Sequence, residues 1–328
     1  MNRVVDTPGR SGSRVEVPDF FIVGHPKCGT TALYEMLRVH PQIYMPDVKE
    51  PWYFASELHV RAPPRPQGMA QTLEEYLELF SEAESGQRVG EASPHYLWSH
   101  TAAQAIAEVK PDARIIAILR EPASFLHSLH LQFVQVYYET EADFRRAISL
   151  EPQRREGRDV PRYSYWPQML LYSEHVRYVE QLRRFHAAFS PEQVLVLIYD
   201  DFRSENEATV RRVLRFLDVD DTAAIEAVEA NPTVRPRSQL LNELVHAVGV
   251  GRGPISHAFK ETIKAVTPSG PRRNALYALQ RRLVFGEPRP PEEALMRELR
   301  LRFKDEVVAL SDYLGRDLVK LWGYDALG

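Results

Sequence analysis

The sequence predicts an α/β fold in which a central parallel sheet is flanked by helices. Short, continuous apolar runs recur along the 328 residues, at 19–24, 114–119 and 194–199, and such runs are typical of strands buried on both faces. Segments with the helical spacing of apolar side chains alternate with these runs, as in proteins built from strand–helix–strand units. We therefore expect one α/β domain rather than two independent ones.

In the first half of the chain, helices are predicted over residues 30–39, 72–80 and 101–109, and from 122 through 133. Pro41 and Pro111 stand just beyond two of these segments, where a proline ends a helix. Pro122 stands at the start of another, because the first turn of a helix tolerates its missing N–H.

In the second half, helices are predicted over residues 172–189, 210–217 and 292–313. The strand signals stop after Pro232, and residues 233–289 are rich in Arg, Pro and Gly. We therefore expect a flexible tail over 1–17 and a domain over 18–328, whose segment from about 233 to 328 forms a mainly helical lid.

Composition excludes several classes of function. The formal net charge of -4 carries no signature of a nucleic-acid partner. The single cysteine, Cys28, allows neither an internal disulfide nor a cysteine zinc cluster. Apolar runs are too short for a membrane span, and the first 17 residues lack the apolar core of a signal peptide. A bacterial, cytoplasmic enzyme is expected.

The strongest motif is Gly24-His25-Pro26-Lys27-Cys28-Gly29-Thr30-Thr31, between the first strand and the first helix. Phosphate groups bind at this place in α/β folds, because backbone N–H groups and the helix dipole point at the anion. Its two glycines match the loop of P-loop nucleoside triphosphatases, but Thr30 replaces the lysine after the second glycine and Lys27 lies inside the loop. The motif predicts a P-loop-NTPase-like phosphate site.

Residues 26–31 resemble the 5′-phosphosulfate loop of sulfotransferases that use 3′-phosphoadenosine 5′-phosphosulfate (PAPS) as sulfuryl donor. The resemblance implies that Lys27 neutralises the bridging oxygen as the phosphate leaves. It also implies that the loop as a whole binds the nucleotide, through Pro26, Lys27, Cys28, Gly29, Thr30 and Thr31.

A second segment makes the resemblance specific. Arg120 follows the predicted strand 114–119, and Ser128 lies eight residues later in the next helix. This spacing is similar to the 3′-phosphate motif of the same family, although the family often has Asn or Asp where Glu121 stands. An arginine offers a forked pair of donors to a phosphate, and a serine adds another.

Two segments provide candidates for the catalytic base. Glu50 precedes a Pro-aromatic turn, and from the residues alone two interpretations stay open: a base whose pKa is raised beside aromatic side chains, or a surface pair of Lys49 with Glu50 before a packing turn. In glycan-type, tyrosyl-protein and many bacterial sulfotransferases the matching Glu deprotonates the acceptor hydroxyl. His95 is the alternative, as a base or an acceptor contact, and Glu91 is expected to orient a neighbour. The family's lysine in this second segment is replaced here by Ala92.

The tract after Pro232 resembles the Arg- and Pro-rich segment that leads into the lid of bacterial sulfotransferases. Arg235 and Arg237 are candidates for a contact with the 3′-phosphate, and a solvated basic loop is the alternative. No set of three closely spaced metal ligands is seen, so we expect activity without a metal.

These observations predict a sulfotransferase that moves the sulfuryl group of PAPS to a hydroxyl and releases 3′,5′-adenosine bisphosphate. The expected acceptor is a small molecule, a sugar or a glycolipid, and no nucleic acid polymer is expected as a partner. Two alternatives stay open: a P-loop kinase or nucleoside triphosphatase, and a nucleotide-binding module without catalysis.

Overall fold

The computed structural model describes residues 17–58, 70–161, 164, 166–223, 225, 235–236, 285–286 and 290–327, the two short stretches 235–236 and 285–286 by their backbone only. Within these ranges the chain forms two compact units. The first comprises Met1–Phe125, Ser173–Asn231 and Arg300–Gly328, and the second comprises Leu126–Tyr172 and Pro232–Leu299. The predicted tail over 1–17 and most of the predicted lid lie outside the described residues.

The first unit is built on a five-stranded sheet with the order β2-β3-β1-β4-β5, and every neighbouring pair is parallel. Its strands are β1 (Phe20–Gly24), β2 (Ile43–Tyr44), β3 (Arg88–Ala92), β4 (Arg114–Leu119) and β5 (Val194–Ile198). The central strand β1 pairs with β3 on one side and β4 on the other, so the carboxyl ends of all three meet at one edge. This arrangement confirms the predicted fold class.

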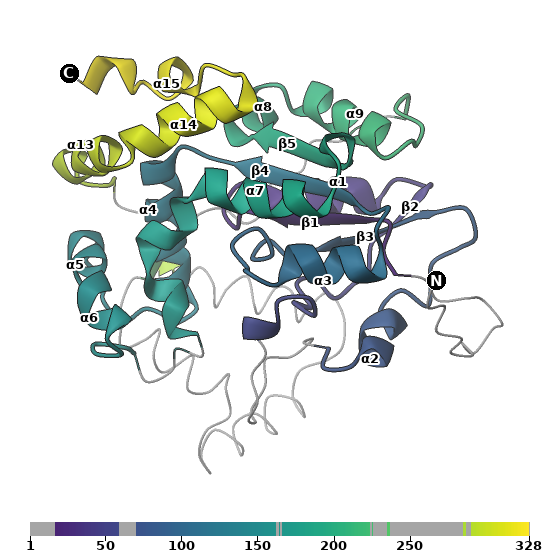
Figure 1. The fold of residues 1–328 in the computed structure, drawn as a ribbon, viewed down its shortest axis with the longest axis horizontal. Helices are drawn as coiled ribbons and strands as arrows, with labels where there is room; N and C mark the ends of the chain where they lie inside the picture. Colours follow the sequence, from purple (N-terminus) through teal and green to yellow (C-terminus); the bar gives the residue numbers. More distant parts are fainter. Residues whose placement is uncertain are drawn as a thin grey trace, which may run out of the picture. The chain divides into compact units, whose positions relative to one another are not determined.

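Helices flank this sheet (Figure 1). They are α1 (Thr30–Arg38), α2 (Leu73–Glu78), α3 (Ala102–Val109), α7 (Tyr178–Ala188), α8 (Tyr199–Ser204), α9 (Asn206–Phe216), α14 (Lys304–Leu314) and α15 (Leu318–Leu321). In Figure 1 α7 runs in front of the strands, and α3 packs against it. The last helices confirm that the C-terminal region is helical.

The second unit holds α5 (Phe144–Ser149), α6 (Glu151–Arg155) and a two-stranded antiparallel pair of β6 (Arg235–Pro236) with β7 (Phe285–Gly286). Two helices, α4 (Pro122–Gln135) and α13 (Glu293–Arg302), begin in one unit and end in the other. A buried ion pair holds the second unit together: Arg154 donates to both oxygens of Glu139 at 2.7 and 2.8 Å. Tyr172 donates to the same carboxylate at 3.1 Å, so the buried charges are paired and hydrogen-bonded.

Two helix predictions need correction. The helix expected over 172–189 is a 3₁₀ turn, Tyr172–Val176, followed by α7. The side-chain amide of Gln181 donates to the carbonyls of Glu174 and His175, each at 3.1 Å. Arg177, between this turn and α7, has non-helical backbone dihedral angles. The helix expected over 292–313 is likewise divided, into α13 and α14, at the buried Phe303.

The sequence pattern missed β3, because this strand is not a continuous apolar run. Gly90 and the fully buried Glu91 interrupt it. Gly90 is required by close packing, since a Cβ at this position would lie 2.1 Å from the ring of Phe20. The strand is therefore specified by contacts with β1 rather than by its own hydrophobic pattern.

Candidate active site

The loop over residues 24–31, which we call the phosphate loop, leads from the end of β1 into α1 at the carboxyl edge of the sheet. Gly29 precedes the helix with φ 88°, and a Cβ there would lie 2.8 Å from the ring of Phe202, so both conformation and space require glycine. Thr30 and Thr31 are the first two residues of α1. Gly29 carries no side chain that could cap the helix, and this helix end suits an anion.

The other loop residues differ in exposure. Lys27 is partly exposed and has a positive φ of 61°, whereas Pro26 and Cys28 are buried. Burial raises the pKa of the Cys28 thiol to about 12, so the thiol stays protonated at neutral pH. Cys28 therefore serves the loop by packing and through its backbone, without thiolate chemistry.

Arg120 lies directly against this loop. It follows β4, the neighbour of β1, and its Nη1 donates to the carbonyl oxygen of Lys27 at 3.1 Å. Its guanidinium also lies 4.8 Å from the centre of the Tyr199 ring. The fold thus brings together the two motifs that the sequence singled out, although 93 residues separate them.

The remaining nucleotide candidates belong to the second unit or lie outside the described residues. Ser128 is buried within α4, in the part of that helix that belongs to the second unit. Arg235 is in β6 of the same unit and is described by its backbone only. Arg237 lies outside the described residues.

The segment that carries Glu50 is tied to the chain just beyond β3. The N–H of Glu50 donates to the Ala92 carbonyl at 3.1 Å. The N–H of Trp52 donates to Ser93 Oγ, and that of Phe54 to the Tyr96 hydroxyl, both at 3.2 Å. Since β3 is the other neighbour of β1, these bonds hold Glu50 at the sheet edge where the phosphate loop begins.

Both of these segments contain residues with left-handed backbone conformation, as do Tyr137, Asp159 and Asp218 elsewhere. Lys27, Glu50 and Trp52 all have φ between 53° and 64°. For residues with a Cβ this left-handed conformation costs roughly 1–2 kcal/mol each. Such strain persists where surrounding structure enforces it, commonly at functional sites.

The pKa of Glu50 contradicts the expectation of a raised value. Burial alone would raise it, but the Lys49 ammonium, 2.7 Å from Glu50 Oε1, and the nearby His95 lower it below its usual range. The carboxylate is therefore ionised at neutral pH and able to accept a proton.

His95 is buried beside this pair. Burial lowers its pKa to about 4, so the imidazole is neutral at pH 7. Its ring lies edge-on to Trp52 with centroids 5.1 Å apart. Neither ring nitrogen has a hydrogen-bond partner among the described residues, and a bound hydroxyl would satisfy one of them.

Of Glu50 and Glu91, it is Glu91 whose pKa is raised. Glu91 is fully buried, and the Tyr76 and Tyr96 hydroxyls each donate to its Oε2 at 3.0 Å. Burial raises the pKa of Glu91 to about 7, against the lowering effect of its hydrogen bonds. The Tyr96 hydroxyl also accepts the N–H of Phe54, so Glu91 is linked through Tyr96 to the segment that carries Glu50.

The structure adds a contact that sequence reasoning missed. His25, fully buried in the loop, lies with Nε2 2.6 Å from Gln181 Oε1 on α7. Gln181 uses its amide hydrogens on two carbonyls, so its oxygen must accept and His25 Nε2 must carry the proton. Burial lowers the pKa of His25 to about 3, which keeps the ring neutral. Nothing in the sequence links two residues 156 positions apart.

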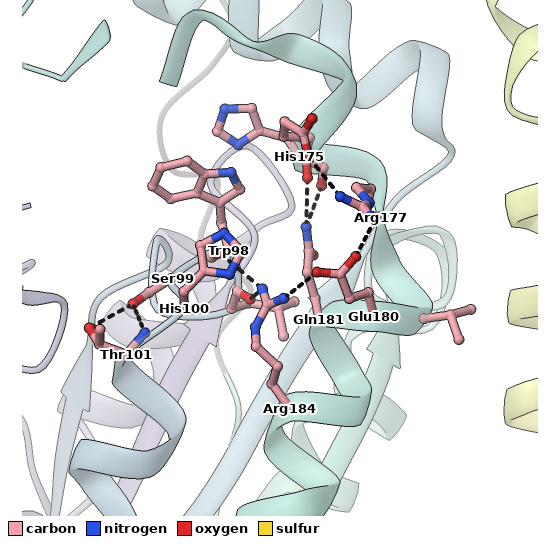
Figure 2. A network of polar contacts seen from close by, with 12 residues as sticks. Trp98, Ser99, His100, Thr101, His175, Arg177, Glu180, Gln181 and Arg184 are labelled. Carbon is pink, nitrogen blue, oxygen red and sulfur yellow. Dashed lines mark hydrogen bonds and ion pairs between the residues drawn. The ribbon is translucent and has the colours of Figure 1, made fainter. Parts of the chain in front are cut away.

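Helix α7 also binds residues 97–98, a second segment near the phosphate loop (Figure 2). Arg184 donates to the carbonyl of Trp98 at 3.0 Å and pairs with Glu180. The Trp98 ring stacks on His175 with centroids 5.3 Å apart. The N–H of the preceding Leu97 donates to the carbonyl of Val23 in β1 at 2.7 Å, so this segment is fixed to the base of the loop.

A model described as the sulfotransferase family matches residues 18–223, more than half of the chain. The chain belongs to the sulfotransferase family.

The chain is similar to a protein of known structure and to curated enzymes. A crystal structure of a sulfotransferase from Alicyclobacillus acidocaldarius is 30% identical, with a TM-score of 0.58, over 72% of this chain and 94% of that one. Carbohydrate sulfotransferase 15 from Mus musculus is 27% identical over 68% of this chain and 47% of its own length. Heparan sulfate glucosamine 3-O-sulfotransferase 3B1 from Mus musculus is 31% identical over 35% and 26%. The chain spans about half the length, or less, of these curated relatives.

Within the described ranges, no helix is both long and apolar enough to cross a membrane. In the same ranges, no group of three or more His, Cys, Asp or Glu side chains could hold a metal ion. Activity without a metal and a cytoplasmic location stay predictions.

The Gln181 contact predicts a loss of stability on substitution. Gln181→Leu removes the acceptor of a buried N–H and the donors to two carbonyls, and an unsatisfied buried group costs about 1–3 kcal/mol. Urea unfolding should show a loss of that size in the free energy of unfolding. Gln104→Leu, on the exposed face of α3, is the control and should change this free energy by less than about 0.5 kcal/mol. Equal midpoints for both variants would contradict the assigned hydrogen bonds.

The raised pKa of Glu91 predicts a pH dependence of stability. Between about pH 4.5 and 7 the folded protein holds a proton on Glu91 that the unfolded chain releases, so the free energy of unfolding falls as pH rises through this window. The fall amounts to at most about 3 kcal/mol, since one pKa unit corresponds to about 1.4 kcal/mol.

Urea unfolding of the wild type and of Glu91→Gln, from pH 4 to 8, measures this effect. The Gln variant lacks the titration, so the wild type should lose stability relative to it across the window and no further above pH 7. A constant difference between the two curves would mean that Glu91 does not titrate there.

Proposed function

We propose that this sulfotransferase transfers the sulfuryl group from PAPS to a hydroxyl of a small-molecule or carbohydrate acceptor, a glycolipid included. The observation that carries the proposal is the contact between Arg120 and the carbonyl of Lys27, which joins the two phosphate motifs at one sheet edge. The Arg120 guanidinium then lies beside the loop that carries Lys27, so one region holds donors for a nucleotide with phosphates at both its 5′ and 3′ positions. The carbohydrate acceptors in the names of the relatives support the acceptor class.

The proposed step is an in-line displacement at sulfur. The acceptor oxygen forms a bond to sulfur while the bond from sulfur to the 5′-phosphate oxygen breaks, and the hydroxyl proton passes to Glu50. Lys27 and the N-terminal end of α1 stabilise the negative charge that gathers on the departing phosphate. Glu50 suits the role of base because its carboxylate is ionised at neutral pH.

The kinase alternative is less well supported. It would use an aspartate after β5 to hold a metal ion with the nucleotide. Asp200 and Asp201, the residues in that place, instead accept hydrogen bonds from Trp322 and Arg316.

Nucleotide choice tests the proposal. The melting temperature of the protein should rise with 3′,5′-adenosine bisphosphate and not with ATP, because only the first carries the 3′-phosphate. The reverse result would favour a kinase or nucleoside triphosphatase. Transfer of label from radioactive PAPS to a panel of sugars and alcohols then distinguishes an enzyme from a binding module without catalysis.

The role of Glu50 predicts a specific kinetic defect. Glu50→Gln keeps size and polarity but cannot take the proton, so kcat should fall by about 10²–10⁴-fold while the Kd for 3′,5′-adenosine bisphosphate stays unchanged. His95→Ala should lower kcat less. If Glu50→Gln kept kcat within a few-fold and folded His95→Ala were inactive, the base would be His95.

The role of Arg120 predicts a binding defect. Arg120→Ala should weaken binding of 3′,5′-adenosine bisphosphate by about 1.5–3 kcal/mol, the range for a hydrogen bond to a charged group, and Ser128→Ala by about half as much. Isothermal titration calorimetry measures both. Wild-type affinity in Arg120→Ala would remove the 3′-phosphate assignment.

A further inference from the structure

Three side chains near the C-terminal end of the first unit contact the residues that directly follow Arg120 or Tyr199. They are Arg316, Trp322 and Tyr324, which follow the turn at Gly315, and we call them the C-terminal clamp. Trp322 and Tyr324 are buried, at 6% and 0% exposure, and the resemblance to a known family assigns none of the three a role.

One contact of the clamp reaches the residue after Arg120. The Tyr324 hydroxyl donates to Glu121 Oε1 at 2.6 Å, and Glu121 is itself buried. The same carboxylate accepts the N–H groups of Ala123 and Ser124 at 3.0 and 2.7 Å, which caps the start of α4. Glu121 is therefore fixed at both oxygens, and its position sets where the chain enters α4.

The Arg120 backbone is held on its other side as well. Its carbonyl oxygen accepts the Tyr178 hydroxyl from α7 at 2.9 Å. The Tyr178 hydroxyl thus binds the carbonyl of the peptide between Arg120 and Glu121, and the Tyr324 hydroxyl of the C-terminal clamp binds the Glu121 side chain. The direction in which the guanidinium leaves the chain depends on that peptide.

The other contacts of the clamp reach α8. Trp322 Nε1 donates to Asp200 Oδ2 at 2.9 Å, and Arg316 binds both oxygens of Asp201, one of them at 2.7 Å. The residue before this pair is Tyr199, whose ring lies under the Arg120 guanidinium at 4.8 Å.

Helix α8 also reaches the phosphate loop. The ring of Phe202, on the same helix, packs so closely on Gly29 that no Cβ fits there. The clamp therefore holds the helix that supports both Arg120 and the start of α1.

We propose that the C-terminal clamp positions Arg120 and the phosphate loop for the nucleotide, along one route through Glu121 and another through α8. Its residues do not touch the nucleotide and act through Arg120, Tyr199 and Gly29. The inference rests on the proposed function, because it takes Arg120 and the loop as the nucleotide site. Loss of a clamp contact should weaken nucleotide binding and leave the acceptor side unchanged.

Two variants with matched controls test the clamp. Tyr324→Phe removes only the hydroxyl that binds Glu121, and Tyr313→Phe removes the hydroxyl that binds His186 Nδ1 at 2.6 Å, on the same C-terminal helices. Arg316→Gln removes the ion pair with Asp201, and its control Arg211→Gln removes the ion pair with Glu207 on α9. Calorimetry with 3′,5′-adenosine bisphosphate gives Kd, and steady-state kinetics gives kcat and the two KM values.

The clamp variants should raise the Kd for 3′,5′-adenosine bisphosphate and the KM for PAPS by about 3- to 30-fold, the range for residues that act through a network. Their kcat and acceptor KM should stay within about twofold of the wild type, and neither control should change Kd. A merely structural role would lower the melting temperature without this split between the two KM values.

The outcomes distinguish failure of the positioning role from failure of the proposed function. If the wild type did not bind 3′,5′-adenosine bisphosphate, the proposed function would fail. If the wild type bound it and the clamp variants bound it equally well, the positioning role would be overturned with the function intact. Equal losses of affinity in the clamp variants and their controls would likewise overturn it, because they would reflect general destabilisation.

Discussion

The parallel pairing of β1 between β3 and β4 is the constraint on which the rest of the first unit depends. Parallel neighbours end at the same edge of a sheet, so the loop after β1, Arg120 after β4 and the segment after β3 meet there. Glu50 is not on a strand, and it joins this edge because its N–H binds the carbonyl that ends β3. A change of strand order would separate the phosphate motifs and the candidate base.

Three carboxylates, those of Glu50, Glu91 and Glu121, differ in their surroundings and therefore in what they can do. Glu50 is partly exposed beside Lys49, and its pKa lies below the usual range. Glu91 accepts hydrogen bonds from two tyrosine hydroxyls, and burial raises its pKa to about 7. Glu121 binds N–H groups at a helix start and a tyrosine hydroxyl. The same side chain thus serves as candidate base, as buried support and as helix cap, according to what surrounds it.

Buried polar side chains around the phosphate loop are, with few exceptions, hydrogen-bonded to elements distant in sequence. His25 is held by α7, Arg120 by the loop and by Tyr178, and α8 by the C-terminal clamp. Such a network fixes the loop before any ligand arrives, so less ordering is left for binding to accomplish. Both ring nitrogens of His95 lack a partner in the described part of the chain, so this ring is available to hydrogen-bond with a bound ligand.

The sequence by itself determined the α/β class, three of the five strands and the family, because continuous apolar runs and the loop over 24–31 are local patterns. It also singled out Lys27, Arg120 and Glu50, whose proposed roles rest on residue type and motif. Only the tertiary structure decided which carboxyl has a raised pKa, since desolvation and neighbouring charge depend on packing: Lys49 beside Glu50, and two tyrosines around Glu91. It alone revealed β3, the bond from His25 to Gln181 and the clamp on Glu121, because these contacts join residues up to 203 positions apart and leave no periodic trace in the chain.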